Sequence, residues 1–409
     1  MLFVPSAYGQ NSGLTDNTLR IDYIFSGDAK QQQISVDELR TFKGWAGRQH
    51  HLDSVPLAGN GQIIMKDAAN DKVLYMTSFS TLFQEWLGTE EATKSKRAFE
   101  NVFLLPMPED SALVHIELYD FKNQVVAQLT HLVNPKDILV RPLLGNTAPH
   151  RYLKKSSLGS KGIDIAIVAE GYQEDDMADF YQHAEEAVTA LFSHEPFHKF
   201  EDRFNIVAVG VPSVDKGVSI PGKNEWRNTA LGSHFDTFYS DRYLTTLRLR
   251  KLHDALVGIP YEHIIILANT DNYGGGGIYN SYMLTTARHP SFHSVVVHEF
   301  GHSFAGLADE YYYDDQFVEY YYPEIEPWEP NITTLKDFDS KWKELLLKNT
   351  PIPTPETSNA AIGVFEGGGY QSKGVYRGCK DCRMKTNESE TFCPVCQRAI
   401  EQIIHFYTE

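Results

Sequence analysis

The segment 295–313, VVVHEFGHSFAGLADEYYY, restricts the folds open to this chain more than any other stretch. Read as a helix with a rotation of about 100° per residue, it places His298 and His302 about 40° apart on one side. Phe300 and Phe304 then lie on the opposite side, together with Val297. One face of the helix is therefore expected to pack in a core, while the other presents two imidazoles.

The spacing H-E-x-x-H is typical of a zinc-binding helix. In this pattern His298 and His302 bind the metal, and Glu299 activates the zinc-bound water as a general base. The five-residue pattern also arises by chance, so a zinc-free helix with two buried, hydrogen-bonded histidines is the alternative.

A catalytic zinc needs a third protein ligand and an open position. Gly306 predicts a left-handed C-cap, which would end the helix and turn the chain. Asp309 follows three residues later and is the expected third ligand. Glu310 is the neighbouring alternative, and Glu319 would take this role in a gluzincin-like arrangement.

The remainder of the 409 residues divides into two halves with different patterns. From about residue 19 to residue 140, short runs alternate between apolar and polar side chains and are rich in β-branched and aromatic residues. This pattern predicts an all-β, sandwich-like N-terminal domain over residues 10–140. Residues 141–155, with Pro142, Gly145 and Pro149, are expected to form a linker.

The second half, residues 156–409, is expected to form one α/β domain. A buried strand at 163–169, a helix at 175–192 and a strand at 204–211 make a βαβ-like unit. A helix near 243–256 and a strand at 263–268 follow. After the glycine run 274–277, a further strand is expected to reach about residue 284. It is either an edge to which an extended peptide can pair or an interior strand.

Charge and hydropathy exclude two classes of function. The chain has 37 Lys and Arg against 54 Asp and Glu, a net charge of −17, which leaves no basic surface for nonspecific nucleic-acid binding. No apolar run approaches the roughly 18 residues of a membrane span. Residues 1–9 fit the remnant of a secretory signal, which predicts a secreted, periplasmic or cell-surface protein; a plain apolar tail is the alternative.

The four cysteines lie close together near the C-terminus. Cys379 and Cys382 form one C-x-x-C unit, and after ten residues Cys393 and Cys396 form another. Two such units predict either a structural zinc site with four thiolates or, in an exported protein, disulfides. A redox pair at Cys393 and Cys396 is disfavoured, because only thirteen residues follow Cys396, too few for a thioredoxin-like sheet.

The string H-E-x-x-H-x-x-x-G-x-x-D resembles the zinc-binding consensus of the metzincin metallopeptidases, with one extra residue between His302 and Gly306. GGGGIYNSY upstream and EPWEPNIT, GVYRGCKDCRMK and FCPVC downstream extend the likeness. Together these segments resemble the bacterial IgA-peptidase family of zinc metallopeptidases. That family also carries an N-terminal β domain, so the resemblance covers essentially the whole chain.

The resemblance implies a multidomain α+β or α/β protein, in which a metzincin-like zinc metalloprotease domain follows the β domain. It implies an endopeptidase acting on protein or peptide substrates, with one catalytic zinc held by His298, His302 and Asp309 and with Glu299 as general base. Met384 is the candidate for the methionine turn beneath the metal. Immunoglobulin is not implied as the substrate, and the oligomeric state is not predicted.

Donors that could stabilise the transition state are not singled out by the sequence. Five residues near the motifs are candidates: Tyr311, Tyr312, Tyr376, Arg377 and His293. Two rival functions belong to other classes: a non-catalytic surface binding protein with a decayed metalloprotease fold, and a thiol-disulfide oxidoreductase. The presence of Glu299 weighs against the first, because a site that only binds metal does not need a general base.

Overall fold

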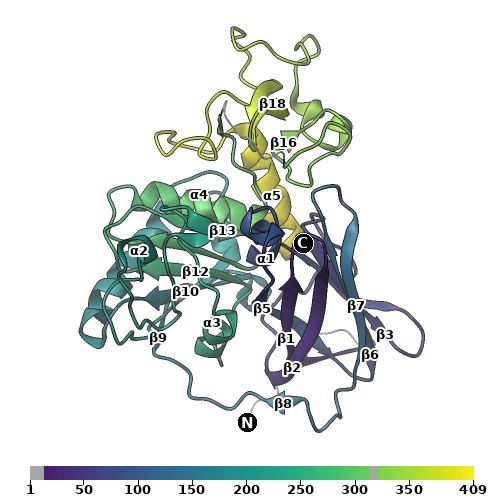
Figure 1. Cartoon of the computed structure of the whole chain (residues 1–409), viewed down its shortest axis with the longest axis vertical. Helices are drawn as coiled ribbons and strands as arrows, with labels where there is room; N and C mark the ends of the chain where they lie inside the picture. The colour runs from purple at the N-terminus through teal and green to yellow at the C-terminus, as the bar shows by residue number, and fades with distance from the viewer. Residues whose placement is uncertain (1–12, 314–319) are drawn as a thin grey trace.

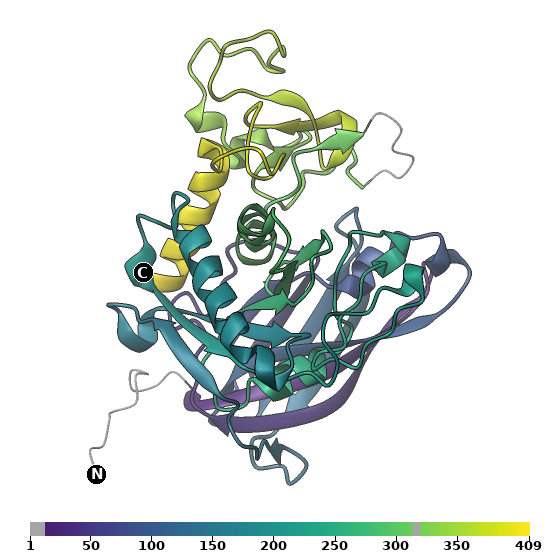
Figure 2. The same ribbon diagram turned by 90° about the vertical axis from the view of Figure 1, so that its left-hand side faces the viewer.

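The computed structural model of the chain describes residues 13–313 and 320–409 (Figure 1). The signal remnant expected at residues 1–9 and the alternative ligand Glu319 lie outside these residues. Figures 1 and 2 show a β-rich part, an α/β part beside it and a C-terminal part above both, from which helix α5 descends. Among the described helices, none combines the length and the apolar character needed to cross a membrane.

Two four-stranded sheets form the β-rich part. Their sequences alternate with period two: in β6, every second side chain from Ala112 to Leu118 is buried. Phe79 of one sheet meets Phe25 and Phe103 of the other, with ring centroids 6.3 and 4.4 Å away. The expected sandwich-like, sheet-rich N-terminal part is therefore confirmed, although it also contains the short helix α1, Leu82–Leu87. Its sheets have the orders β5-β1-β2-β8, with bounds Arg97–Pro108, Leu14–Gly27, Gln32–Lys43 and Arg141–Pro142, and β4-β3-β6-β7, with bounds Val73–Phe79, Gly61–Asp67, Ala112–Tyr119 and Val125–Val133.

A six-stranded sheet of order β13-β14-β12-β10-β11-β9 organises the α/β part. The four inner strands are parallel, and β13 and β9 run antiparallel at the two edges. The strands expected at 163–169, 204–211 and 263–268 are present as β10, β11 and β12. The bounds are Gly275–Ile278 for β13, Tyr282–Thr286 for β14, His263–Ala268 for β12, Ile163–Glu170 for β10, Phe204–Val209 for β11 and His150–Lys154 for β9.

Three details differ from the sequence-based expectations. The glycine run forms the edge strand β13 itself, whereas the strand that follows it, β14, is an interior strand. The helix expected near 243–256 is only the short α3, Leu249–Ala255. The segment 141–155 is not plain linker, because β8 pairs with β2 and β9 pairs with β11. These pairings join residues far apart in sequence, which local patterns do not reveal.

Helices cover the α/β sheet and connect it to the C-terminal part. Helix α2, Met177–Phe192, and helix α4, Phe292–Ala305, pack against each other. The apolar face of α4 enters the core through Phe300 and Phe304, whose rings lie 5.5 and 5.9 Å from that of Phe197. The C-terminal part contains a small sheet and α5. Its bounds are Tyr312–Tyr313 for β15, Ile332–Thr333 for β16, Phe365–Gly368 for β17, Tyr370–Arg377 for β18 and Pro394–Thr408 for α5.

The buried His263, at the start of β12, makes the stability of the fold sensitive to acid. Burial lowers the pKa of its imidazole to about 3 from an ordinary value of 6.5, and its ring packs against Phe304 and Tyr407. The unfolded chain thus binds a proton as the pH falls through about 6.5, whereas the folded chain does not until about pH 3. The free energy of unfolding therefore decreases as the pH falls below about 6.5, by on the order of 3 kcal/mol between about pH 7 and pH 4.

Replacing this residue, His263→Phe, is expected to flatten the fall of melting temperature between about pH 7 and pH 4. Thermal unfolding followed by circular dichroism measures the slope. His150→Phe, at an exposed position, is the matched control and should keep the wild-type slope. An unchanged slope in His263→Phe would show that other groups carry the acid sensitivity.

Candidate metal centre

Helix α4 presents the two histidines and Glu299 because its other face is fixed in the core. The helix ends at Gly306, which adopts the left-handed conformation with φ of 59° and donates its N–H to the carbonyl of His302. A Cβ at this position would also lie 2.7 Å from Trp328 and 2.8 Å from Leu57. Both conformation and space therefore require glycine here, and the turn brings residues 307–310 back toward the histidines.

Three donor atoms converge at the end of this turn. The Nε2 atoms of His298 and His302 are 3.1 Å apart, and Oδ1 of Asp309 lies 3.1 and 3.3 Å from them. Ligands of a tetrahedral zinc, bound at about 2.0–2.1 Å, stand about 3.3 Å from one another. The separations thus fit a single ion between the three side chains. Glu310, the alternative to Asp309, points elsewhere.

The hydrogen bonds of the two imidazoles fix which nitrogen is free. Nδ1 of His298 lies 2.9 Å from the carbonyl of Arg383, and Nδ1 of His302 lies 2.5 Å from that of Leu307. A carbonyl oxygen only accepts, so each Nδ1 carries the proton in the neutral ring. Both Nε2 lone pairs are then directed toward Asp309 and are available to a cation.

Asp309 is a buried anion with one oxygen unsatisfied by hydrogen bonds. Its residue is 5% exposed, and among the described residues Oδ1 has no hydrogen-bond donor. The hydroxyl of Tyr370 donates to the other oxygen, Oδ2. Burial opposes the charge, but without a metal the imidazoles of His302 and His298, in their protonated form, hold the pKa of Asp309 well below its usual range. A buried carboxylate oxygen aimed at two imidazole lone pairs is the environment expected of a metal ligand.

Glu299 lies beside these donors and faces strand β13. One of its oxygens is within 4.8 Å of both imidazoles, but the shorter distances to Asp309 make that residue the better third ligand. Burial raises the pKa of the Glu299 carboxyl. A Cβ on Gly275 would meet Oε1 of Glu299 at 2.6 Å. The missing side chain in β13 thus provides the space that this carboxylate occupies.

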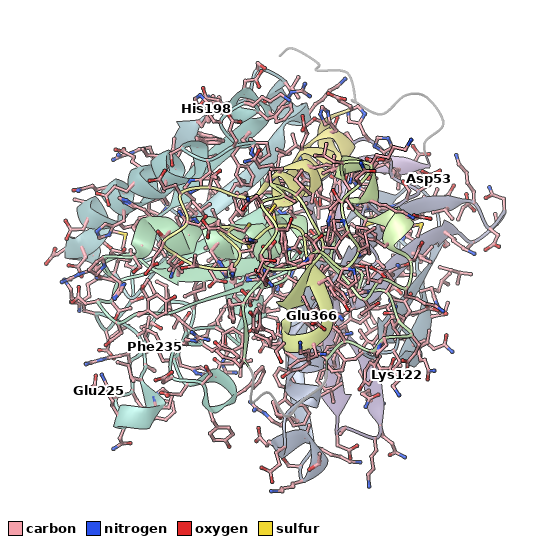
Figure 3. The ribbon with its side chains drawn as sticks, turned by 90° about the horizontal axis from the view of Figure 1, so that it is seen from above. Asp53, Lys122, His198, Glu225, Phe235 and Glu366 are labelled. Atoms are coloured by element: carbon pink, nitrogen blue, oxygen red, sulfur yellow. The ribbon has the colours of Figure 1, made fainter. Side chains whose placement is uncertain are left out.

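A cleft of about 790 Å³ opens above the donors and is lined by both the α/β part and the β-rich part. Figure 3 shows the molecule from above, with Lys122 toward the β-rich part and Phe235 within the α/β part. Glu85 of helix α1, Leu82–Leu87, reaches the cleft and accepts a hydrogen bond from the hydroxyl of Tyr243. Desolvation by the neighbouring cleft residues raises the pKa of the Glu85 carboxyl to about 7, although its side chain remains exposed.

Of the five candidate transition-state donors, only Tyr311 lines the cleft. The remaining four, Tyr312, Tyr376, Arg377 and His293, lie outside it. Glu85, Tyr243 and Tyr370 also line the cleft, and none of them is singled out by the sequence. They come from segments distant from the histidine motif, and no local pattern marks them.

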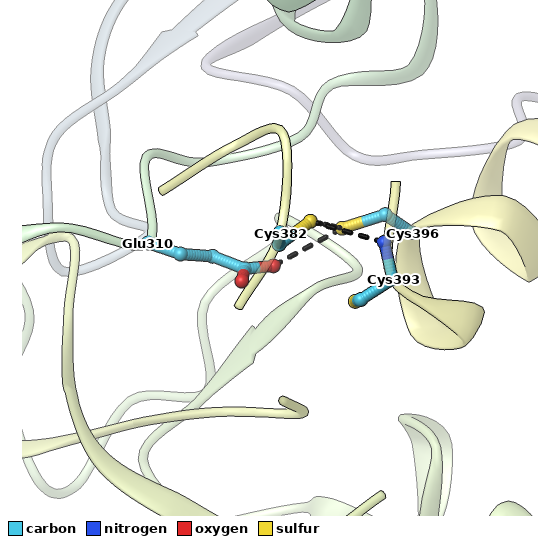
Figure 4. A group of neighbouring side chains, drawn as sticks. All are labelled: Glu310, Cys382, Cys393 and Cys396. Carbon is cyan, nitrogen blue, oxygen red and sulfur yellow. Dashed lines mark hydrogen bonds between the residues drawn. The ribbon is translucent and has the colours of Figure 1, made fainter. Parts of the chain in front are cut away.

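Met384 and the cysteines lie beneath α4. Met384 is fully buried, and its sulfur would lie 2.8 Å from a Cβ on Gly301, in the middle of the helix. It thus packs against α4 at Gly301, between the two histidines in sequence, and its role as the methionine turn stays a prediction. All four cysteines are buried and none is joined to another by a disulfide. Glu310 joins three of them rather than the imidazoles (Figure 4).

The α/β fold and the convergent donors define a protein with one candidate metal centre in a cleft. The sequence profile described as IgA Peptidase M64 matches residues 152–360 and 356–404, and that described as Peptidase M64 N-terminus matches residues 11–130. The chain therefore belongs to the IgA peptidase M64 family, as the sequence resemblance predicted, and is a peptidase by family.

Among solved structures, the crystal structure of metalloproteinase-II from Bacteroides fragilis shares 12% identity and covers 55% of this chain and 72% of that chain. Its TM-score of 0.22 is too low to establish a common fold. No curated protein matches the chain.

Proposed function

We propose that the protein is a zinc-dependent endopeptidase whose metal ligands are His298, His302 and Asp309. Membership of a peptidase family supplies the class of reaction. The observation that carries the proposal is the convergence of two imidazole nitrogens and one carboxylate oxygen, 3.1 to 3.3 Å apart. Three protein donors leave one position open, as catalytic zinc sites do.

The donor set favours zinc over the hard cations. Magnesium and calcium prefer sites built from oxygen atoms, whereas two imidazoles with one carboxylate suit zinc. When bound, the ion would supply a Lewis acid that polarises the scissile carbonyl and acidifies water. The carbonyls of Arg383 and Leu307 hold the two rings in the tautomer that keeps Nε2 unprotonated.

Glu299 is the proposed general base. Its carboxylate stands next to the donors and at the floor of the cleft. It would accept a proton from the attacking water and pass that proton to the leaving nitrogen of the cleaved bond. Tyr370 would position Asp309 through the hydrogen bond to Oδ2, which leaves Oδ1 directed toward the imidazoles.

Strand β13 is the proposed place where the substrate main chain pairs, but only over a short length. On the side of β13 away from β14, Gly275 already makes two main-chain hydrogen bonds. Its N–H donates to the carbonyl of Arg242, and its carbonyl accepts from the N–H of Leu244. The carbonyl of Tyr279 accepts from Ser80 of the β-rich part. The main-chain N–H and carbonyl of Gly277, two residues after Gly275, face the same edge, and Gly277 lines the cleft. A substrate would thus gain main-chain bonds at one residue, with cleft side chains providing other contacts.

A cleavage assay with an unfolded protein as substrate tests the proposal. Purified protein is expected to cut the substrate internally, to lose this activity after dialysis against a chelator and to recover it on addition of zinc. Cleavage that survives complete removal of metal would contradict the proposal. Binding of the substrate without any cleavage by the zinc-loaded protein would instead favour the non-catalytic binding function.

The substitution Gly275→Ala tests the packing between β13 and Glu299. The added Cβ would meet Oε1 of Glu299 at 2.6 Å, so the carboxylate must move. A displacement of about 1 Å is expected to lower kcat up to about 100-fold, while elemental analysis should find the metal retained. Gly145→Ala is the matched control, because its Cβ would meet only Val257 at 3.8 Å. Equal kcat in both variants would contradict the proposed role of Glu299.

A further inference from the structure

A second group of donor atoms lies within the core, on the opposite side of the turn that carries Asp309. One donor atom from each of Cys382, Cys393, Cys396 and Glu310 lies within 4.8 Å of all the others (Figure 4). The four residues are between 0% and 4% exposed. The sulfurs of Cys382 and Cys396 are 3.6 Å apart, close to the separation of about 3.8 Å between two thiolates on a tetrahedral zinc.

The surroundings of this group suit an anionic sulfur ligand. The backbone N–H groups of Cys393 and Met384 donate to Sγ of Cys382, at 3.2 and 3.5 Å. Such N–H donors stabilise a thiolate more than a thiol. Cys396 lies in the first turn of α5, and Cys393 is its N-cap residue, so the positive end of the helix dipole faces the cluster.

Glu310 supplies the observation that points to a ligand. Its Oε1 accepts from Asn331 at 3.0 Å and from Cys396 at 3.1 Å. Its Oε2 is buried without a hydrogen-bond partner among the described residues. A fully buried carboxylate next to three sulfurs is costly without a cation to neutralise it.

Cys379 lies beside the group without belonging to it. Its thiol donates to the carbonyl of Ala361 at 3.2 Å and also interacts with Cys393, but it is not one of the donors that all lie close to one another. The four donors are therefore three cysteines and one glutamate, a combination that the C-x-x-C spacing does not reveal.

We propose that Cys382, Cys393, Cys396 and Glu310 bind a second zinc ion, which has a structural role and fixes the turn that carries Asp309. One ion would satisfy all four donors at once, with the tetrahedral number of ligands. A disulfide between Cys382 and Cys396 would join only two of them and would leave the Glu310 carboxylate buried beside Cys393 without compensation.

The peptide chain connects this second site directly to the first. Asp309 and Glu310 are consecutive, and their side chains reach the two different clusters. The N–H of Glu310 donates to the carbonyl of Met384 at 2.8 Å, and the carbonyl of Arg383 accepts from Nδ1 of His298. The segment 382–384 thus contributes a sulfur to one site and orients a histidine of the other. This connection rests on the proposed function, whereas the second site itself does not.

Cobalt substitution of the full chain tests the second site without reference to activity. Cobalt-loaded wild type is expected to show sulfur-to-cobalt charge-transfer absorption, and Cys382→Ser should abolish it. Cys379→Ser, the matched control, should retain the band and the metal. His302→Ala should also retain the band while losing the other metal, so failure of the catalytic proposal would be distinguishable from failure of this one.

Glu310→Gln isolates the carboxylate and preserves its shape, so it is the variant to use if Cys382→Ser does not fold. It is expected to weaken binding of the thiolate-bound metal at least about 10-fold in competition with a chelator. Absence of the sulfur-to-cobalt band in wild type would overturn the proposal. So would wild-type metal affinity in Glu310→Gln, loss of the band in Cys379→Ser, or fewer than four reactive thiols after chelation and unfolding, which would indicate a disulfide.

Discussion

Replacing Glu299 by glutamine is expected to lower kcat for peptide hydrolysis by about 10²- to 10⁴-fold, with the metal retained. Glutamine keeps the shape of the side chain, and so its contact with β13, but it cannot accept the proton of the attacking water. His298, His302 and Asp309 are untouched, so binding of zinc should not change. The measurement combines steady-state kinetics on an unfolded protein substrate with elemental analysis of the same sample.

The matched control for this experiment is Glu185→Gln, on the exposed face of α2 and 58% exposed at its side chain. It should leave kcat unaltered. If Glu299→Gln kept wild-type kcat, the general base would have to be another carboxylate. Glu85 would be the first to examine, because it lines the same cleft and the protein raises its pKa to about 7.

Removing the third ligand, Asp309→Ala, is expected to reduce zinc affinity at the histidine site by more than about 100-fold and to abolish cleavage. The carboxylate is the only anion within 3.3 Å of the two imidazole nitrogens among the described residues. Its loss leaves two neutral ligands on α4, which do not hold zinc tightly. Titration with a chelator of known affinity measures the change.

Asp271→Ala is the control for that experiment, because its side chain is 71% exposed and pairs with Arg288. Zinc affinity in this variant should equal that of wild type. Full retention of zinc by Asp309→Ala would contradict its assignment as a ligand and would direct attention to Glu319, which lies outside the described residues. The sulfur-to-cobalt band should persist in Asp309→Ala, which distinguishes loss of one metal from collapse of the fold.

Much of the candidate site follows from local patterns in the sequence. Helical spacing alone places His298 and His302 on one face and Phe300 in the core. Gly306 marks the end of the helix, because only glycine readily adopts the required backbone conformation. The extra residue before Gly306 is accommodated by extending α4 to Ala305, which still returns Asp309 to the imidazoles.

The contributions that the sequence does not reveal depend on contacts between distant segments. Glu85 comes from the β-rich part, and Tyr370 from β18, yet both lie near the donors. Glu310 reaches the cysteines only because the 307–310 turn passes beside segment 382–384. The edge position in the sheet belongs to the glycines of β13 rather than to the strand after them, since strand order is set by nonlocal pairing.

The most direct test of the account is the zinc content of protein purified without added metal, measured by elemental analysis for wild type and for His302→Ala. The account predicts two zinc ions per chain in wild type and one in His302→Ala. An identical zinc content in the two proteins, or wild type that binds no zinc even when zinc is supplied, would contradict a metal centre at His298, His302 and Asp309.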